Sequence, residues 1–142
     1  MSVLANILSE YTTLLDALTG FTGWTANREA HDPDDVLHRK FRLQIGSGSF
    51  ALGALQMGGT GIELIAPLDL EVKWDPEGAE STIEGTIADD ILQVLDVMLS
   101  QSSKPAACRL ITLDGISRDE KERPITMHLR FNARYTETVT VT

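Results

Sequence analysis

The sequence predicts an α+β fold, in which two helices pack on one face of an antiparallel four-stranded sheet with a long glycine-rich hairpin loop. Two segments have the 3.6-residue apolar period of amphipathic helices, and four segments alternate between apolar and polar residues. Such alternation is typical of antiparallel strands that bury one face. The expected order is helix, strand pair, helix, strand pair, and 142 residues suit a single domain spanning 1–142.

Two amphipathic helices are expected, over residues 2–19 and about 82–101. Ser2 suits the N-cap of the first helix, and Gly20 suits the position just beyond its C-terminus. The apolar stripe of the first helix comprises Leu4, Ile7, Leu8, Tyr11, Leu14, Leu15 and Leu18. The stripe of the second comprises Ile83, Ile87, Ile91, Val94, Leu95, Met98 and Leu99. We expect Asp89 and Asp90 to lie on the solvated face of the second helix.

Four strands are expected, over residues 36–45, 62–75, 107–116 and 124–141. Pro67 lies inside the second of these. Because proline has no backbone N–H to donate to a neighbouring strand, Pro67 predicts an edge position or a bend.

The segment 46–61 between the first two strands contains six glycines and is expected to form a long flexible loop. Its Gly46-x-Gly48-x-x-Ala51 pattern matches a dinucleotide-binding fingerprint, with Glu63 or Asp69 further along. That fingerprint requires a helix facing the pyrophosphate, and the segment is too short to supply one. A mobile hairpin loop is therefore the favoured interpretation. Four apolar residues of this loop have no evident core to join, and we expect them to contact a partner: Phe50, Leu52, Leu55 and Met57.

Other groupings of reactive side chains give weak functional signals. A cluster of His31, Asp32, Asp34 and Asp35 offers hard-cation ligands, but its spacing does not match an EF-hand and favours turn chemistry, with weak divalent binding left open. Cys108 could pair with His128 or His38, yet its short apolar strand favours a structural cysteine. No established catalytic motif is present. We therefore expect a protein that is not an enzyme and uses no cofactor or metal.

The charge balance bears on partners. The chain has 12 Lys and Arg against 21 Asp and Glu, a formal net charge of −9. Tight nucleic-acid binding needs clustered basic residues, so it is not expected. Like charge would still let an acidic protein guide DNA without holding it. The sequence has no apolar run of 18 residues, so no membrane association is expected.

The polar face of the last predicted strand is a candidate interaction surface. It presents His128, Arg130, Asn132 and Arg134 at alternate positions, about 6.6–6.8 Å apart by strand geometry. A solvated sheet face would account for this pattern. A subunit interface or a channel wall would account for it equally, because open sheet faces are often buried on assembly.

The arrangement of segments resembles the tail terminator (tail completion) proteins of long, non-contractile-tailed bacteriophages. The resemblance spans nearly the whole chain: an N-terminal helix, the basic strand HRKFRLQIGSG, the glycine-rich loop, a strand ending Val-x-Trp-x-Pro, a helix with Ala-Asp-Asp-Ile, and the final strand RPITMHLRFNARYTE. It implies a hexameric ring on the head-proximal end of the tail tube. Such a ring stops tube polymerisation, joins the neck and leaves an open channel for DNA, without catalysis.

The resemblance defines what we expect of partners and location. The partners would be further copies of the chain, the tail tube protein and the neck or connector protein, while DNA passes through without specific binding. The location would be the virion tail near the neck, after assembly in the host cytoplasm. The expected interface residues are Phe50, Leu52, Leu55, Met57, His128, Arg130, Asn132 and Arg134. Two alternatives stay open: another head–tail joining protein, or a small non-catalytic ligand-binding domain with the loop as a lid.

Overall fold

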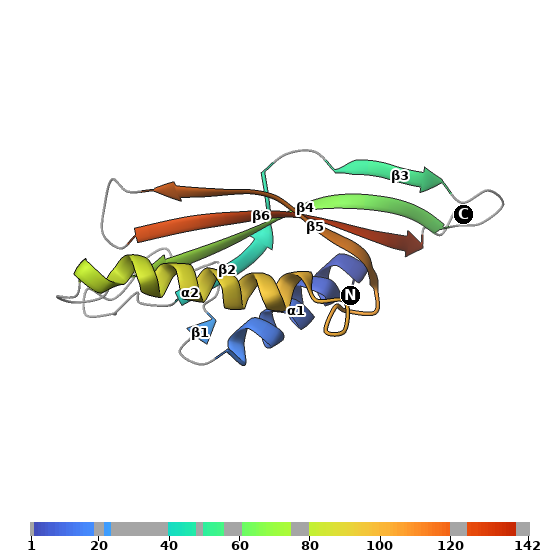
Figure 1. Ribbon diagram of the computed structural model, residues 1–142. Helices are drawn as coiled ribbons and strands as arrows, with labels where there is room; N and C mark the ends of the chain where they lie inside the picture. The colour runs from blue at the N-terminus through green and yellow to red at the C-terminus, as the bar shows by residue number, and fades with distance from the viewer. Residues whose placement is uncertain are drawn as a thin grey trace.

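The computed structural model describes residues 2–18, 22–23, 40–47, 50–55, 61–74, 80–119 and 125–138. The elements, in chain order, are α1 (Val3–Asp16), β1 (Thr22–Gly23), β2 (Lys40–Ile45), β3 (Ala51–Leu55), β4 (Gly61–Trp74), α2 (Glu80–Leu99), β5 (Cys108–Asp119) and β6 (Ile125–Thr138). Both helices lie on the same side of the sheet (Figure 1). The α+β fold predicted from the sequence is therefore confirmed.

The sheet is built on four antiparallel strands in the order β2-β4-β6-β5. Strands β4 and β6 form its centre and pair along their whole length, from Gly61 opposite Thr138 to Trp74 opposite Ile125. Two short strands extend it, because β1 pairs in parallel with β2 and β3 pairs antiparallel with β4. Strand β3 was not expected, since it lies within the segment predicted to be loop. Residues 48–49 and 56–60 of that segment lie outside the described residues.

Pro67 was expected at an edge position or at a bend, and the edge position was wrong, because β4 is a central strand. Strand β2 pairs with β4 only as far as Leu68, and β3 begins at Ile65, so Pro67 lies in the gap between these two neighbours. Its carbonyl accepts a hydrogen bond from the Gly46 N–H at 2.8 Å. Since the N and O of one strand residue point to the same side, the missing N–H lies on this side of β4, where the regular pairing with β2 has ended.

Helix α1 begins as the sequence predicts. The Ser2 side chain accepts a hydrogen bond from the Ala5 N–H at 3.1 Å, which is the N-cap interaction. Four residues of the predicted stripe are buried: Leu4, Ile7, Tyr11 and Leu15. The other three are partly buried against the same core: Leu8, Leu14 and Leu18. Gly20, expected beyond the helix, lies outside the described residues.

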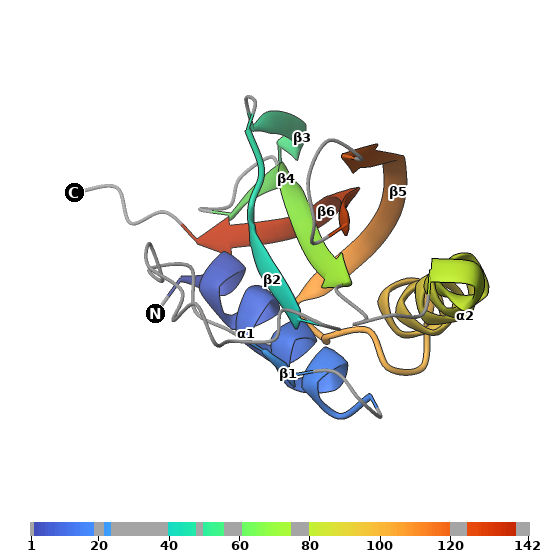
Figure 2. The same ribbon diagram turned by 90° about the vertical axis from the view of Figure 1, so that its left-hand side faces the viewer.

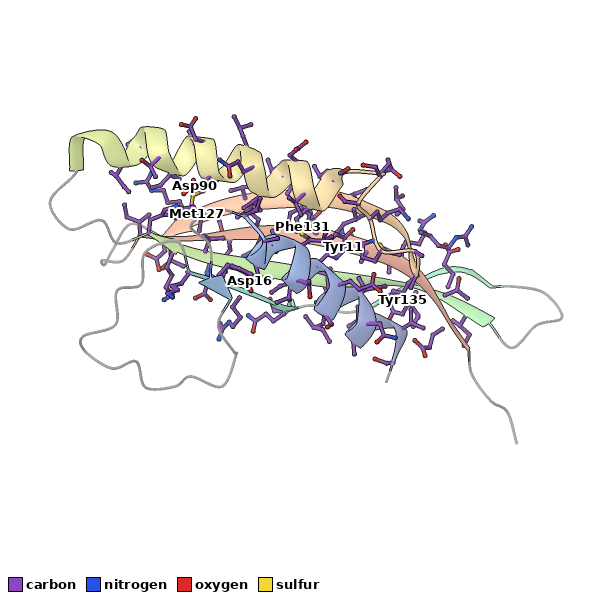
Figure 3. The ribbon with its side chains drawn as sticks, turned by 90° about the horizontal axis from the view of Figure 1, so that it is seen from below. Tyr11, Asp16, Asp90, Met127, Phe131 and Tyr135 are labelled. Atoms are coloured by element: carbon purple, nitrogen blue, oxygen red, sulfur yellow. The ribbon has the colours of Figure 1, made fainter. Side chains whose placement is uncertain are left out.

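Helix α2 buries Ile83, Ile87, Val94 and Met98 from the predicted stripe, and Ile91 and Leu95 are partly buried against the same core. Leu99 was wrongly expected in this stripe, because it is 36% exposed near the end of the helix. The helix also buries Asp90, which was wrongly expected on the solvated face. The Asp90 carboxylate accepts a hydrogen bond from the Trp74 indole N–H at 2.8 Å, and each residue is about 1% exposed. The indole thereby gains the partner that a buried N–H requires, and the bond ties α2 to the end of β4. Figure 3, seen from the helix side, places Asp90 between α2 and the sheet.

The core also holds the single cysteine of the chain. Cys108 is fully buried near the Tyr11 hydroxyl, and its Sγ lies 3.4 Å from the Leu110 carbonyl oxygen. Burial raises the pKa of the Cys108 thiol, and burial together with the thiol raises the pKa of Tyr11. Both groups therefore stay protonated near neutral pH. This agrees with the structural role expected for Cys108.

The predicted strand boundaries are close to those of the structure where they can be compared. Strand β5 runs three residues beyond the predicted end at 116, to Asp119. The expected start of the first strand, residues 36–39, lies outside the described residues, as do His38 and the cluster of His31, Asp32, Asp34 and Asp35.

Substitution of Asp90 by leucine tests the bond between α2 and β4. The change leaves the Trp74 N–H buried without an acceptor, so we expect a loss of about 1–3 kcal/mol in the free energy of unfolding. Asp89→Leu, at the exposed neighbouring position, should stay within about 0.5 kcal/mol of the parent protein. Urea unfolding followed by circular dichroism measures both, and equal losses would contradict the assigned role of Asp90.

Reaction of Cys108 with a thiol reagent tests its burial. Because its pKa is raised and no thiol surface is exposed, the native protein should react at least about 100-fold more slowly than the protein in concentrated urea. Raising the pH from 7 to 8 should leave the native rate low. A native rate close to that of the unfolded chain would show that the thiol is accessible.

Candidate functional site

The face of the sheet opposite the helices carries most of the polar side chains of the strands. Figure 2, turned by 90°, shows α1 and α2 together on one side of the sheet, leaving the opposite face without a helix among the described residues. We call this surface the open face. Its charged and polar residues include Lys40, Arg42, Glu63, Asp69, Glu71, Lys73, Arg109, His128, Arg130, Asn132 and Arg134.

Strand β4 supplies the acidic groups of the open face, and its neighbours supply cations. Glu71 accepts a hydrogen bond from Arg42 of β2 at 2.9 Å and lies 3.5 Å from the Lys73 ammonium. Asp69 contacts the Nδ1 atom of His128 on β6, with the closer carboxylate oxygen at 3.1 Å. The acidic residues of the central strand are therefore bonded across the sheet in both directions.

Glu63 is the most deeply buried acid of this face, with a side chain only 6% exposed. The Arg109 guanidinium donates to one carboxylate oxygen at 2.5 Å, and Arg134 Nε lies 3.3 Å from the other. Two cations thus compensate one carboxylate that burial would otherwise destabilise. This arrangement joins β4 to both β5 and β6.

A hollow of about 370 Å³ opens at the centre of the open face. It lies where two strands depart from regular pairing: β2 leaves β4 after Ile45, and the pairing of β5 with β6 shifts between Leu113 and Gly115. Its lining includes Gly46, Ser47, Pro67, Asp69, Asp114, His128, Arg130 and Asn132. Strand irregularities of this kind often re-aim side chains at functional positions.

Arg130 is the cation of this hollow that has no carboxylate bonded to it among the described residues. Its register partner on β4 is Asp69, but the Asp69 carboxylate is bonded to His128 instead. Arg130 is also exposed to solvent. It is therefore available to bind an anionic group that approaches the open face.

The structure brings together three of the predicted interface residues, because His128, Arg130 and Asn132 all line the hollow. Arg134 lies further along β6, bonded to Glu63. Phe50 is 42% exposed in the segment that joins β2 to β3.

Of the other predicted interface residues, Leu52 and Leu55 belong to β3, and Met57 lies outside the described residues.

Sequence reasoning named Glu63 and Asp69 only with the dinucleotide-binding pattern, and it missed two further acids of this surface, Glu71 and Asp114. The alternation of the segment 62–75 places three of these four acids on the polar side of its strand. What the sequence does not reveal is that β4 pairs with β6, which follows it by more than fifty residues.

The two helices carry charge of one sign. Neither contains Lys, Arg or His, whereas together they contain seven acids: Glu10, Asp16, Glu80, Glu84, Asp89, Asp90 and Asp96. Glu84 is hydrogen-bonded to both terminal nitrogens of Arg118 on β5 at 2.8 and 2.7 Å, and this holds its pKa below the ordinary value. Its contribution to stability is therefore present at neutral pH and lost as the pH falls through that lowered pKa. The helical layer is anionic, and the open face is not.

Large apolar side chains are exposed at two places besides Phe50. On α2, Leu92 is 66% exposed, and with Leu95, Asp96, Leu99 and Ser100 it borders a shallow groove. On β5, at the edge of the sheet, three residues are exposed: Leu110, Leu113 and Ile116. By register, Leu110 lies on the open face, whereas Leu113 and Ile116 lie opposite Phe131 and Leu129 of the helix side.

Within the described ranges, no three His, Cys, Asp or Glu side chains are grouped so as to hold a metal ion. Over the same part of the chain, every helix is too short or too polar to cross a membrane.

No protein-family model matches this chain, and no match was found among curated proteins.

Glu63→Gln tests the carboxylate that binds two arginines. The substitution leaves Arg109 and Arg134 without their anionic partner, so we expect a loss of about 1–3 kcal/mol in the free energy of unfolding. Glu84→Gln, at an exposed ion pair on α2, should leave the midpoint of urea unfolding close to that of the parent protein. If the two variants lose the same stability, burial of Glu63 does not set the strength of its ion pairs.

Proposed function

We propose that this protein is a structural component of a bacteriophage virion and forms a ring, expected to be a hexamer, on the head-proximal end of the tail tube. The ring stops tube polymerisation, joins the tail to the neck and lets DNA pass through its centre. Its partners are further copies of the chain, the tube protein and the neck protein. It acts without catalysis. The resemblance of its segments to tail terminators supports this proposal.

The observation that carries the proposal is the presence of two unlike uncovered surfaces on opposite sides of the molecule. One is the open face, with its hollow and the exposed Arg130. The other is the anionic helical layer, with the exposed Leu92. A closed ring needs such unlike surfaces, because every copy in it contacts one neighbour with the first and the other neighbour with the second.

The charge of the whole chain favours a channel that releases DNA. At −9, the protein repels the phosphate backbone, so DNA would slide past a ring of these subunits without being held. The exposed Phe50 and the edge residues Leu110, Leu113 and Ile116 supply apolar surface for the tube or the neck.

The hollow favours a second candidate function, a small ligand-binding domain. Its volume of about 370 Å³ and its polar lining suit a small charged molecule. A ligand bound there would raise the melting temperature by mass action, whereas ring assembly would make the melting temperature depend on protein concentration. A thermal-shift screen at several protein concentrations separates the two candidates. A neck protein that also forms rings remains an alternative, and this screen does not separate it from a tail terminator.

Electron microscopy of the purified protein tests ring formation. Negative staining at high concentration should show rings with a central hole, and native mass spectrometry of the same sample should give six times the monomer mass. A protein that stays monomeric up to about 1 mM would contradict ring formation by the free chain, since Kd values above this correspond to less than about 4 kcal/mol of binding. That result would favour the ligand-binding candidate.

Phe50→Ser tests the apolar surface of the segment between β2 and β3. Because this side chain is already 42% exposed, the free energy of unfolding should change by no more than about 0.5 kcal/mol. We expect weaker binding to the tube or neck, or weaker self-association, by sedimentation at equal concentrations. The matched control is Thr12→Ser on α1, which removes one methyl group and should alter neither property. If Phe50→Ser assembles like the parent protein, Phe50 is not an interface residue.

A further inference from the structure

We infer that the open face of one copy binds the outer side of helix α2 of a second copy, in a head-to-tail contact centred on Arg130. This inference deepens the proposed function, on which it rests, by naming the two surfaces that join neighbouring subunits.

The first surface is the hollow of the open face. Of its two acids, Asp69 is bonded to His128 and Asp114 lies on β5 where the register shifts, while Arg130 is exposed and has no bonded carboxylate among the described residues. Asn132, beside Arg130 on the same side of β6, adds an amide that can donate to the same anion. A guanidinium and an amide that converge on one hollow are suited to bind a carboxylate.

The second surface is the outer side of α2. Asp89, Leu92, Asp96 and Leu99 are all exposed, at spacings of three or four residues that place them on one side of a helix. The side therefore combines two carboxylates with two leucines. No cation occurs anywhere in α2, so none lies between these carboxylates to neutralise them.

The two surfaces complement one another in charge and in apolar character. The carboxylates of α2 match Arg130, which has no bonded anion of its own among the described residues. The exposed Leu92 and Leu99 of α2 supply apolar surface on one side of the contact. On the other side, Leu110 is exposed and shares its face of the sheet with Arg134. Complementary charges at a contact set the orientation of the partners and speed their encounter.

A second copy is the partner that these observations favour, because one chain carries both halves of the contact. The helices and the open face lie on opposite sides of the sheet, so the α2 helix of one copy cannot contact the open face of the same copy. Two copies joined in this way still leave one unused surface at each end. Addition therefore continues, and it ends in a closed ring when the rotation between neighbouring copies closes, as the proposed function requires.

Two variants, each with one surface blocked, test the inference. Arg130→Glu reverses the charge of the open face and leaves α2 intact. Asp89→Lys/Asp96→Lys reverses the charge of α2 and leaves the open face intact. By analytical ultracentrifugation, each variant alone should be monomeric at concentrations where the parent protein forms larger assemblies. Mixed in equal amounts, they should assemble again with the two variants alternating, because the native α2 of one meets the native open face of the other, and the lysines of the reversed α2 meet the reversed charge at position 130.

Exchanging the charges of the two surfaces within one chain tests whether they bind each other. The triple variant Asp89→Lys/Asp96→Lys/Arg130→Glu restores opposite charges across the contact, so it should regain at least part of the assembly that each blocked variant loses. In the parent protein, raising the salt concentration from 50 to 500 mM should weaken assembly by roughly tenfold or more, because salt screens the contact.

Control variants separate loss of the contact from loss of the fold or from a change in total charge. Asn6→Glu/Thr13→Glu lowers the net charge by two, as Arg130→Glu does, but at exposed positions on α1. It should assemble like the parent protein. Circular dichroism and melting temperature should show that every variant compared is folded.

The possible outcomes distinguish failure of this inference from failure of the proposed function. If the parent protein forms rings and both blocked variants also form them, the ring stands and these two surfaces are not its contacts. If the blocked variants are monomeric but their mixture also stays monomeric, the two surfaces do not bind each other and the inference is overturned. If the parent protein never assembles, the ring itself fails and this contact fails with it.

Discussion

The fourteen-residue antiparallel pairing of β4 with β6 is the constraint on which the other features of the molecule depend. Because side chains alternate along a strand, this one ladder fixes which residues lie on each side of the sheet. Leu70 and Leu129 face the helices and are fully buried, whereas their neighbours Asp69 and His128 meet on the open face. A shift of one residue in register would exchange these faces, so the core and the polar surface are specified together.

The same ladder explains why a central strand can carry buried acids. Glu63 and Glu71 would be costly inside a sheet without compensation, and each has two cations within ion-pair distance. The cations come from β2, β5 and β6, or from β4 itself, so the ion pairs reinforce the strand order. The His128 bond to Asp69 uses the acid opposite Arg130, which leaves that guanidinium exposed. An interaction that stabilises the sheet thus also creates the group most suited to bind a partner.

The sequence predicts local structure well where one period dominates. The stripe of α1 and the alternation of β6 are confirmed, because nearly every residue in them follows the pattern. Asp90 and β3 were missed for physical reasons. An aspartate on a helix normally faces water, and only the fold brings the Trp74 indole within 2.8 Å of it. Glycines in the segment of β3 favour a loop locally, whereas pairing with β4 is a tertiary interaction.

The candidate site could likewise be predicted only where the pattern of a single strand determines it. The alternation of β6 places His128, Arg130 and Asn132 on one face, but the hollow they line depends on two departures from regular pairing. Pro67 faces a gap that exists because β2 ends and β3 begins there, and Asp114 lies where β5 shifts its register. A regular four-stranded sheet with the same side chains would present a flat polar surface. These irregularities convert it into a concave surface with an available cation, opposite a helical layer that contains acids and no bases. The contact proposed between copies depends on that combination of shape and charge.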